Sequence, residues 1–262
     1  MTNGLRIASM KYLRTLREAG LHYVILSLNG LDDDIYRQIN GHALVGPKLK
    51  ALENCRQLGL PVHLSATITR GINENQIGPL LDLADQTENV LQVRFRAMSP
   101  VGNYLDGGEM FMSELVKIIC REGGIDYDLW CRQQDFYEHV GRTIGVDHLR
   151  PRLCAMRADL TPDRVPFASE WDWDQWDRSR LRRPRLLAKL LASYGPAYAL
   201  QYARSMMSRY RYTPHRKFKR IAVRVWPNLQ TMDLGLNARC TSLYHRDGQT
   251  MPFCLCNVLS NT

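Results

Sequence analysis

Three cysteines near the C-terminus have the residue type and spacing that can bind a metal. Cys240 is followed by Cys254 and Cys256 in a C-x13-C-x-C arrangement. Asp247-Gly248 lies between them and predicts the turn of a β-hairpin, which would bring Cys240 roughly opposite Cys254. Cys254 and Cys256 are two residues apart, so on a regular strand both thiols would point to one face. Such a group of thiols can bind zinc or an iron–sulfur cluster.

A metal site of this kind needs a fourth ligand, and the candidates are Cys154 and His245. The alternative is that the three are ordinary buried free cysteines. Cys55 and Cys120 lie in helical apolar patterns and are predicted to be packing residues, whereas the pattern around Cys131 decides nothing.

Polar side chains also follow three apolar, strand-like runs. The ends of these runs read Ser27-Leu28-Asn29-Gly30, Ser65–Gly71 and Arg94-Phe95-Arg96. In parallel βα folds, ligands bind at the carboxyl ends of the strands. These side chains therefore fit a polar ligand such as a nucleoside or an amino acid. The alternative is helix capping, because Asn29-Gly30 precedes Asp32, which can start the next helix.

The first hundred residues repeat a helix–Gly–strand unit that would position these polar ends. Helical patterns alternate with near-continuous apolar runs, and each helical pattern ends in Gly or Asn, as a left-handed C-terminal cap prefers. The helical patterns cover 13–20, 49–59 and 76–89, and the strand patterns cover 21–30, 60–71 and 90–97. The repeat predicts an α/β fold with a parallel sheet and right-handed crossovers.

The strand count is too small for a closed barrel. We count three complete strands and the tail of a fourth, whereas a (β/α)₈ barrel has eight strands in roughly 250 residues. The pattern stops near residues 99–103, so an open, partial sheet is expected. Residues 5–9 either close an earlier strand or begin the first helix.

The remainder of the chain changes character twice. Residues 104–177 are acidic, with helical patterns near 110–122 and 130–144. Residues 184–212 form a basic amphipathic pattern, and residues 220–228 read as a strand before the cysteine hairpin. The sequence thus predicts three regions, which are a partial barrel (1–103), a mostly helical region (104–217) and a C-terminal cysteine region (218–262).

The positive charge is concentrated in one segment. Residues 178–224 contain 14 Lys/Arg and no Asp or Glu, in a chain whose net charge is +9. Such a segment can be a solvated helix face, or it can contact an anionic membrane surface, which its Leu, Tyr and Met residues favour over nucleic acid. The 23% of charged residues is ordinary for a globular protein, and no secretory signal or long apolar run occurs, so a reduced cytoplasmic location is expected.

Together these motifs resemble the radical S-adenosylmethionine (SAM) superfamily. The segments similar to that family's third to sixth barrel strands, and to the turns and helix that follow them, are Thr2–Gly4, Ile25–Gly30, Asp34–Gly41, Ala66–Asn73 and Val93–Arg96. The tail from Cys240 to Leu259 is similar to a narrower branch, the tetraether lipid synthase-like proteins with C-terminal auxiliary-cluster cysteines. The resemblance implies a partial (β/α) radical SAM-type barrel, then a helical region, then a small C-terminal Cys-bearing β-hairpin.

The resemblance also implies roles for individual residues. Thr2, Ser27 and Thr67 would line the carboxylate and ribose of SAM, and Arg94 or Arg96 would face adenine or the substrate. The other cofactor-binding residues would be Asn3, Asn29 and Ser65. An auxiliary [4Fe–4S] cluster would be held by Cys240, Cys254 and Cys256 together with Cys154. The substrate would be a small molecule or a lipid, and the reductant a protein such as ferredoxin or flavodoxin.

One departure from the family pattern changes the expected activity. In the family, a reduced [4Fe–4S] cluster bound by a CX3CX2C loop cleaves SAM, and the resulting radical abstracts hydrogen from an unactivated carbon. No CX3CX2C motif occurs in the 262 residues. We therefore expect a truncated gene product, rather than a genuine remnant, with no catalytic residues of its own. Two other functions stay open, which are a non-catalytic zinc- or Fe–S-binding interaction module and a nucleic-acid-associated protein that uses segment 178–224.

Overall fold

The computed structural model describes most of the first two thirds of the chain and parts of the remainder. The described residues are 1–99, 109–144, 151, 154–161, 163–167, 188, 192, 196, 200, 219–226, 235, 240, 243–246, 248–252 and 254–255. Most of the basic amphipathic segment lies outside these residues, as does Cys256.

The centre of the fold is a six-stranded, mostly parallel sheet with the order β1-β2-β3-β6-β4-β5. The strands are β1 (Val24–Ser27), β2 (Val62–Ile68), β3 (Val90–Ala97), β4 (Ala155–Leu160), β5 (Pro166–Phe167) and β6 (Lys219–Arg224). β1, β2, β3 and β6 are parallel, whereas β4 is antiparallel to both of its neighbours. The prediction of an α/β fold with a parallel sheet is confirmed.

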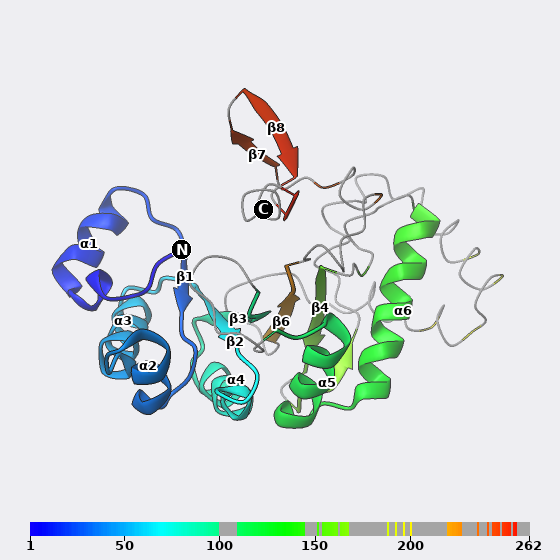
Figure 1. The fold of residues 1–262 in the computed structure, drawn as a ribbon, viewed down its shortest axis with the longest axis horizontal. Coiled ribbons are helices and arrows are strands. Elements are labelled where there is room, and N and C mark those ends of the chain that lie inside the picture. Colours follow the sequence, from blue (N-terminus) through cyan, green and yellow to red (C-terminus); the bar gives the residue numbers. More distant parts are fainter. Residues whose placement is uncertain are drawn as a thin grey trace.

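Helices α2 to α5 lie along one side of the sheet, and the β7–β8 hairpin lies on the other side (Figure 1). The helical elements are η1 (Arg6–Ala8), α1 (Met10–Glu18), α2 (Asp33–Asn40), α3 (Val45–Gln57), η2 (Glu74–Gln76), α4 (Ile77–Gln86), α5 (Met112–Gly123) and α6 (Tyr127–Ile144). The hairpin strands are β7 (Leu243–Arg246) and β8 (Gln249–Pro252), with Gly248 at φ +78° in the predicted turn.

The N-terminal residues settle the alternative left open for residues 5–9. They form η1 and the start of α1, so they begin the first helix. The tail of a further strand lies just before them, because Thr2 bridges Leu26 of β1 in the parallel sense. The N–H of Thr2 donates to the carbonyl of Ile25, and its carbonyl accepts from the N–H of Ser27, both at 2.9 Å.

Helix ends follow the predicted chemistry in all but one case. Gly20 and Gly59 follow α1 and α3 with φ of +97° and +62°, as left-handed caps do. The expected cap at Asn89 is wrong, because α4 already ends at Gln86 and the next residue, Thr87, is extended. The Asn89 amide instead donates to the Leu60 carbonyl at 2.8 Å, which ties the start of β3 to the start of β2.

The two faces of the sheet differ sharply. The face toward the helices is apolar, and its side chains are fully or almost fully buried, among them Leu26, Leu64, Ala66, Val93, Phe95, Ile221 and Val223. The alternate residues of the same strands are mostly polar and half-buried. This alternation places the hydrophobic core between the sheet and helices α1 to α5 and leaves the opposite face polar.

A buried ion pair joins the antiparallel part of the sheet to the parallel part. Arg220 of β6 donates from Nε and Nη2 to the two carboxylate oxygens of Asp159 of β4, at 2.6 and 2.9 Å. The Tyr137 hydroxyl of α6 donates to the same carboxylate at 3.3 Å, and the Gln133 amide donates to the Asp159 carbonyl at 3.1 Å. The ion pair is bidentate and has further hydrogen bonds, which compensate the free-energy cost of burying its charges. The bonds from Gln133 and Tyr137 also hold α6 against the β4 end of the sheet.

The strand around 220–228 was predicted, but its position was not. The sequence division placed it in the C-terminal cysteine region, whereas β6 pairs with β3 and β4 inside the main sheet. β4 itself was not predicted as a strand. The expected regular strand carrying Cys254 is also wrong, because β8 ends at Pro252 and Cys254 is helical.

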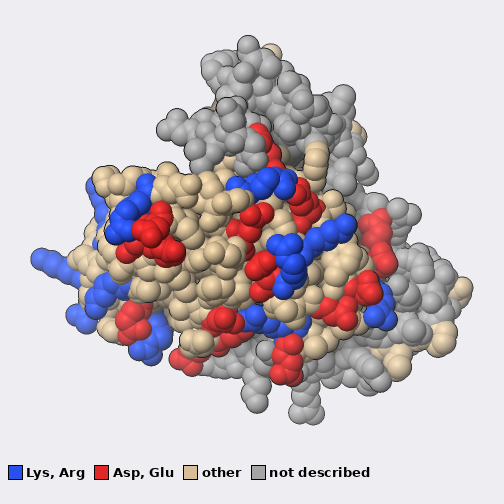
Figure 2. Space-filling model, turned by 60° about the horizontal axis from the view of Figure 1, so that its bottom comes forward, with Lys and Arg blue, Asp and Glu red and all other residues tan. Residues whose placement is uncertain are grey.

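The outer face of the helices carries charges of both signs. Figure 2 shows Lys/Arg and Asp/Glu side chains interspersed over the side of the molecule where helices α2 to α5 lie. Such a surface is typical of a solvated face, so this side of the protein is not a basic binding patch.

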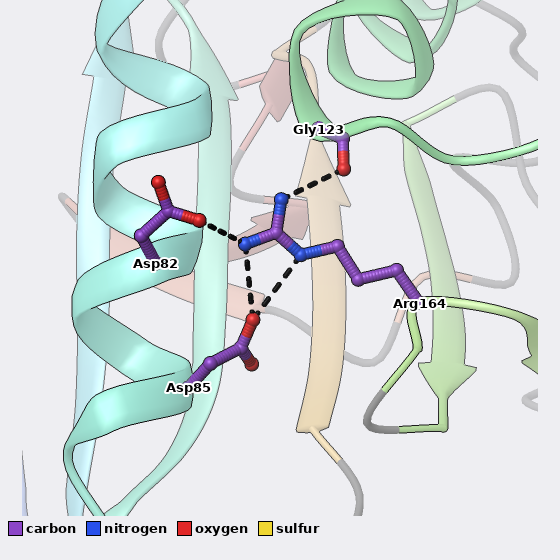
Figure 3. Close-up of polar contacts among 4 residues, drawn as sticks. All are labelled: Asp82, Asp85, Gly123 and Arg164. Atoms are coloured by element: carbon purple, nitrogen blue, oxygen red, sulfur yellow. Dashed lines mark hydrogen bonds and ion pairs between the residues drawn. The ribbon is translucent and has the colours of Figure 1, made fainter.

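One charged residue connects the turn after β4 to the helix layer. Arg164 lies in the β4–β5 turn with φ +58° and reaches Asp82 and Asp85 of α4 and the Gly123 carbonyl of α5 (Figure 3). Its Nε and Nη2 donate to Asp85 Oδ2 at 3.1 and 3.0 Å, and its Nη1 donates to Gly123 at 2.9 Å. These contacts fasten the antiparallel edge of the sheet to α4 and α5.

Replacing this arginine is expected to destabilise the fold. Arg164→Asn should lower the free energy of unfolding by about 1–2 kcal/mol, because it removes a partly buried, multiply bonded guanidinium. Asn tolerates the left-handed backbone, so the loss reports the side-chain contacts rather than strain. Urea denaturation measures the change. Arg121→Gln is the control, since Arg121 is 69% exposed and pairs with its neighbour Glu122. Equal stability of the two variants would contradict this role.

Candidate functional site

The polar face of the sheet presents its side chains in three rows that cross the strands in register. The first row is Ile25, His63, Gln92, Arg220 and Asp159; the second is Ser27, Ser65, Arg94, Ala222 and Arg157; the third is Thr67, Arg96, Arg224 and Ala155. The second and third rows lie toward the carboxyl ends of the parallel strands. That is the edge where ligands bind in parallel α/β sheets, so these two rows form the candidate site.

Three hydroxyl groups of the site are not used by the fold. The side chains of Ser27, Ser65 and Thr67 make no hydrogen bond within the part of the chain that the structure describes. Ser65 is only 6% exposed. Buried hydroxyl groups in proteins have hydrogen-bond partners. Because helices cover the other face of this sheet, a ligand bound on the polar face can supply the partners of these hydroxyls. All three residues were predicted from the ends of their strands.

Three arginines lie beside these hydroxyls. Arg94 and Arg96 are half-buried on β3, and Arg224 is exposed at the end of β6. The pKa of Arg94 is lowered first by burial and then by the positive charges of Arg96 and Arg224. Burial and the charge of Arg224 also lower the pKa of Arg96. Arg94 and Arg96 were predicted site residues, whereas Arg224 was missed although it alternates with Ile221 and Val223 along a strand-like run.

A buried lysine shapes the edge of the site at β1. Lys48 of α3 is 3% exposed, and its ammonium donates to the carbonyls of Asn3 and Ser27 at 2.8 and 2.6 Å. It also lies 5.3 Å from the centre of the Tyr36 ring. Burial lowers the pKa of Lys48 to about 8. Lys48 therefore holds the N-terminal turn against the end of β1.

Lys48 was missed by the sequence reasoning, although a signal was present. It stands at the spacing of Ala51, Leu52 and Cys55, which are the buried apolar residues of α3. A lysine within such an apolar stripe has a polar partner in the interior.

The predicted residues Thr2 and Asn3 have local structural roles. The Thr2 hydroxyl accepts from the N–H of Gly4, and the Asn3 side chain accepts from the N–H of Leu5, both at 3.1 Å. These bonds form the turn that precedes η1. Gly4 has φ +91°, and a Cβ there would come within 2.6 Å of the Leu26 side chain, so this turn requires glycine.

Two asparagines fix the ends of β1 and β2 relative to each other. Asn29 accepts from the N–H of Thr67 at 3.0 Å through its side-chain oxygen. The Asn73 amide donates to the carbonyls of Asn29 and Thr67 at 2.8 and 2.9 Å, and its oxygen accepts from the N–H of Thr69 at 2.8 Å. Asn29, a predicted ligand residue, is thus used for positioning, and Asn73 has the same function without having been predicted.

The cysteine site is placed only in part. Cys154 precedes β4, Cys240 is half-buried, Cys254 is buried, and Cys256 lies outside the described residues. Burial, and then the thiolate charges of Cys154 and Cys240, raise the pKa of Cys254 to about 11, so the three thiols lie within electrostatic range of one another. Among the residues that the structure describes, however, no set of three His, Cys, Asp or Glu side chains is arranged to hold a metal ion.

The other candidate ligand and the remaining cysteines lie elsewhere. His245 is exposed on β7 and contacts the Thr250 hydroxyl at 3.0 Å across the hairpin. Cys55 and Cys120 are buried in the core, as predicted, and Cys131 is half-buried on α6. No helix in the described part of the chain is both long and apolar enough to cross a membrane.

Comparison with known proteins finds a family match for the N-terminal part of the chain. Residues 1–84 match the model of the Radical SAM superfamily. The chain is 30% identical over 174 residues to the 7,8-dihydro-6-hydroxymethylpterin dimethyltransferase of Methanocaldococcus jannaschii. The matched stretch covers 64% of this chain and 32% of that protein. It is 31% identical over 117 residues to the GTP 3',8-cyclase of Staphylococcus epidermidis, covering 44% and 33%.

A third relative gives a similar picture. The probable GTP 3',8-cyclase of Pyrococcus abyssi is 34% identical over 92 residues, which covers 35% of this chain and 29% of that protein. The chain thus spans about a third of the length of the curated relatives it matches. The narrower resemblance to tetraether lipid synthase-like proteins is not confirmed by these relatives and stays a prediction.

The histidine of the first row offers a test of the electrostatics of the polar face. His63 packs against the Tyr23 ring, with ring centres 5.4 Å apart. Burial, and then the charges of Arg94 and Arg220, lower the pKa of His63 to about 4 from an ordinary 6.5. A depressed histidine pKa stabilises the fold above pH 6.5, and this contribution is lost as the pH falls toward 4.

We therefore expect the stability of the wild type relative to His63→Gln to fall as the pH is lowered through this window. Paired urea denaturation curves measure the difference and remove the effect of carboxylates common to both proteins. His22→Gln, at an exposed neighbouring position, is the control. A wild-type advantage over His63→Gln that grows on acidification would show that the sign is wrong.

Proposed function

Residues 1–84 belong to the radical SAM superfamily, and from this premise we propose that the polar face of the sheet binds S-adenosylmethionine. The observation that carries the proposal is the group of hydroxyls at Ser27, Ser65 and Thr67, which lack hydrogen-bond partners among the described residues and lie at the carboxyl ends of β1 and β2. SAM has ribose hydroxyls and a carboxylate, which such groups can bind. SAM supplies, when bound, the source of a carbon radical.

The residues divide into those that would contact SAM and those that would position them. Ser27, Ser65 and Thr67 would contact the ribose and carboxylate through their hydroxyls. Lys48 and Asn29 hold backbone groups in place, since they bond the Ser27 carbonyl and the Thr67 N–H. Thr2 and Asn3 would act in the same way, through the turn they form. The edge would therefore be organised before the ligand arrives, which reduces the entropy lost on binding.

The residues of this chain do not fit the cluster that cleaves SAM. The 262 residues contain no CX3CX2C motif. The proposal for this chain is accordingly SAM binding. SAM cleavage, a small-molecule or lipid substrate, a ferredoxin- or flavodoxin-like reductant and a cytoplasmic location are further proposals that the resemblance suggests.

An auxiliary cluster is a second, separable proposal. Cys154, Cys240 and Cys254 are close enough for the charge on one thiol to affect another, and Cys256 follows Cys254 by two residues. We propose that these four cysteines bind a [4Fe–4S] cluster. A non-catalytic, zinc-binding module would use the same cysteines, and the test below distinguishes it from the cluster.

SAM binding is tested on the full chain by calorimetric titration with SAM and with S-adenosylhomocysteine. Ser65→Ala and Thr67→Val should each weaken binding about threefold to tenfold, since each removes one hydrogen bond. Thr15→Val is the matched control, because the exposed Thr15 hydroxyl donates to the Lys11 carbonyl of its own helix, away from the polar face. Absence of SAM binding by the wild type, or equal binding by all four proteins, would overturn the proposal.

The cysteine proposal is tested by anaerobic reconstitution with iron and sulfide, followed by metal analysis and visible absorption. The wild type and Cys131→Ser should bind iron with the visible absorption of thiolate-ligated clusters, and Cys254→Ser and Cys256→Ser should lose most of it. Iron bound equally by all four proteins would refute these ligands. Zinc retained in place of iron would refute the cluster and support the interaction module.

A further inference from the structure

We propose that Arg94, Arg96 and Arg224 bind a phosphate group carried by the substrate. The proposal names a class of substrate for the polar face. That a substrate binds there at all rests on the proposed function. The presence of an oxyanion site at these arginines is argued and tested independently of SAM.

The strand register brings the three guanidinium groups together. Arg94 and Arg96 are two residues apart on β3, so their side chains leave the same face with about 6.6 Å between their origins. Arg96 pairs directly with Arg224 of the neighbouring parallel strand, and adjacent strands are about 4.8 Å apart. All three side chains therefore rise from one small area at the carboxyl ends of β3 and β6.

The charge of this group is not compensated by carboxylates. The pKa of Arg94 and that of Arg96 respond to burial and to other arginines, and no Asp or Glu among the described residues contributes to either. The other buried arginine of this face, Arg220, is paired with Asp159 at 2.6 Å. A half-buried group of like charges is unfavourable by itself, and a bound anion removes that cost.

Unused hydrogen-bond donors point to the kind of anion. The Nε atoms of Arg94 and Arg96 are buried and have no hydrogen-bond partner in the described structure. Ser65, which pairs in register with Arg94, has a hydroxyl that is equally unused. A phosphate monoester has two negative charges and three acceptor oxygens, and guanidinium groups bind such oxygens with paired N–H donors. A carboxylate has one charge and two oxygens and would leave most of this site unsatisfied.

The experiment uses the full chain in phosphate-free buffer near neutral pH, with inorganic phosphate as the probe and chloride at matched ionic strength as the blank. Calorimetry should show phosphate binding to the wild type. Arg94→Gln and Arg96→Gln should each weaken it about tenfold or more, because each loses a charged, bidentate contact. The double variant Arg6→Gln/Arg14→Gln makes the same kind of charge change at exposed positions near α1 and should bind phosphate as the wild type does.

Several results would overturn the proposal. The first is a wild type that responds to phosphate no more than to chloride. The second is phosphate binding that Arg94→Gln/Arg96→Gln does not weaken. If the wild type fails to bind phosphate while these substitutions weaken SAM binding, the arginines hold the SAM carboxylate instead. A short RNA that binds through these arginines where inorganic phosphate does not would place the protein with nucleic-acid binders and equally refute a small phosphorylated substrate.

A thermal melt without ligand separates a binding role from a structural one. Removing one of three like charges should leave the melting temperature of Arg94→Gln unchanged or raise it, whereas a large fall would show that Arg94 supports the fold and would refute the assignment. A failed proposal for SAM is distinguishable, because in that case phosphate binding and its dependence on Arg94 persist while SAM fails to bind.

Discussion

Side chains alternate between the two faces of a strand, and in this sheet the alternation separates the packing of the protein from its chemistry. Along β3, Val93 and Phe95 are buried against the helices, whereas Arg94 and Arg96 lie on the polar face. The two sets cannot be changed independently, because a register shift of one residue would turn the arginines into the core and the apolar residues toward the ligand side. The helix layer, the ion pair at β4 and the candidate site all depend on this one register.

The strand ends show how a rigid edge is built from long-range side-chain bonds. Lys48 reaches from α3 to two carbonyls that lie 45 and 21 residues earlier in the chain. Asn73 joins the ends of β1 and β2 from the loop that follows β2. These residues bond backbone carbonyls, and through the backbone they determine where the hydroxyls of Ser27 and Thr67 lie. Substitution at such positions would therefore disturb ligand binding through the backbone rather than through a lost contact.

The features predictable from the sequence are those with a local cause. The βα repeat follows from alternating apolar patterns, the caps after α1 and α3 follow from Gly20 and Gly59, and the hairpin follows from Asp247-Gly248. The strand ends also predicted Ser65, Thr67, Arg94 and Arg96 as candidate site residues, and the register places all four on the polar face of β2 and β3. These signals lie within a few residues of the elements they describe.

The features that were missed depend on contacts between distant segments. Nothing near residues 155–160 indicates a strand, because β4 owes its place to β6 and to the Asp159–Arg220 pair. Arg224 becomes a neighbour of Arg96 only when β6 lies beside β3. For Cys254, the hairpin pattern predicted a strand, whereas β8 ends at Pro252 and residues 254–255 are helical.

The position of β6 has a consequence for how the chain can fold. Its neighbours in the sheet, β3 and β4, end at residues 97 and 160, but β6 itself begins only at residue 219. During synthesis, both neighbours are made before the strand that joins them exists, so the edge of β4 stays unpaired while about 60 more residues are made and the edge of β3 while about 120 are made. The centre of the sheet is thus completed last, and a ribosome that stalls before residue 219 would release a chain with two open edges.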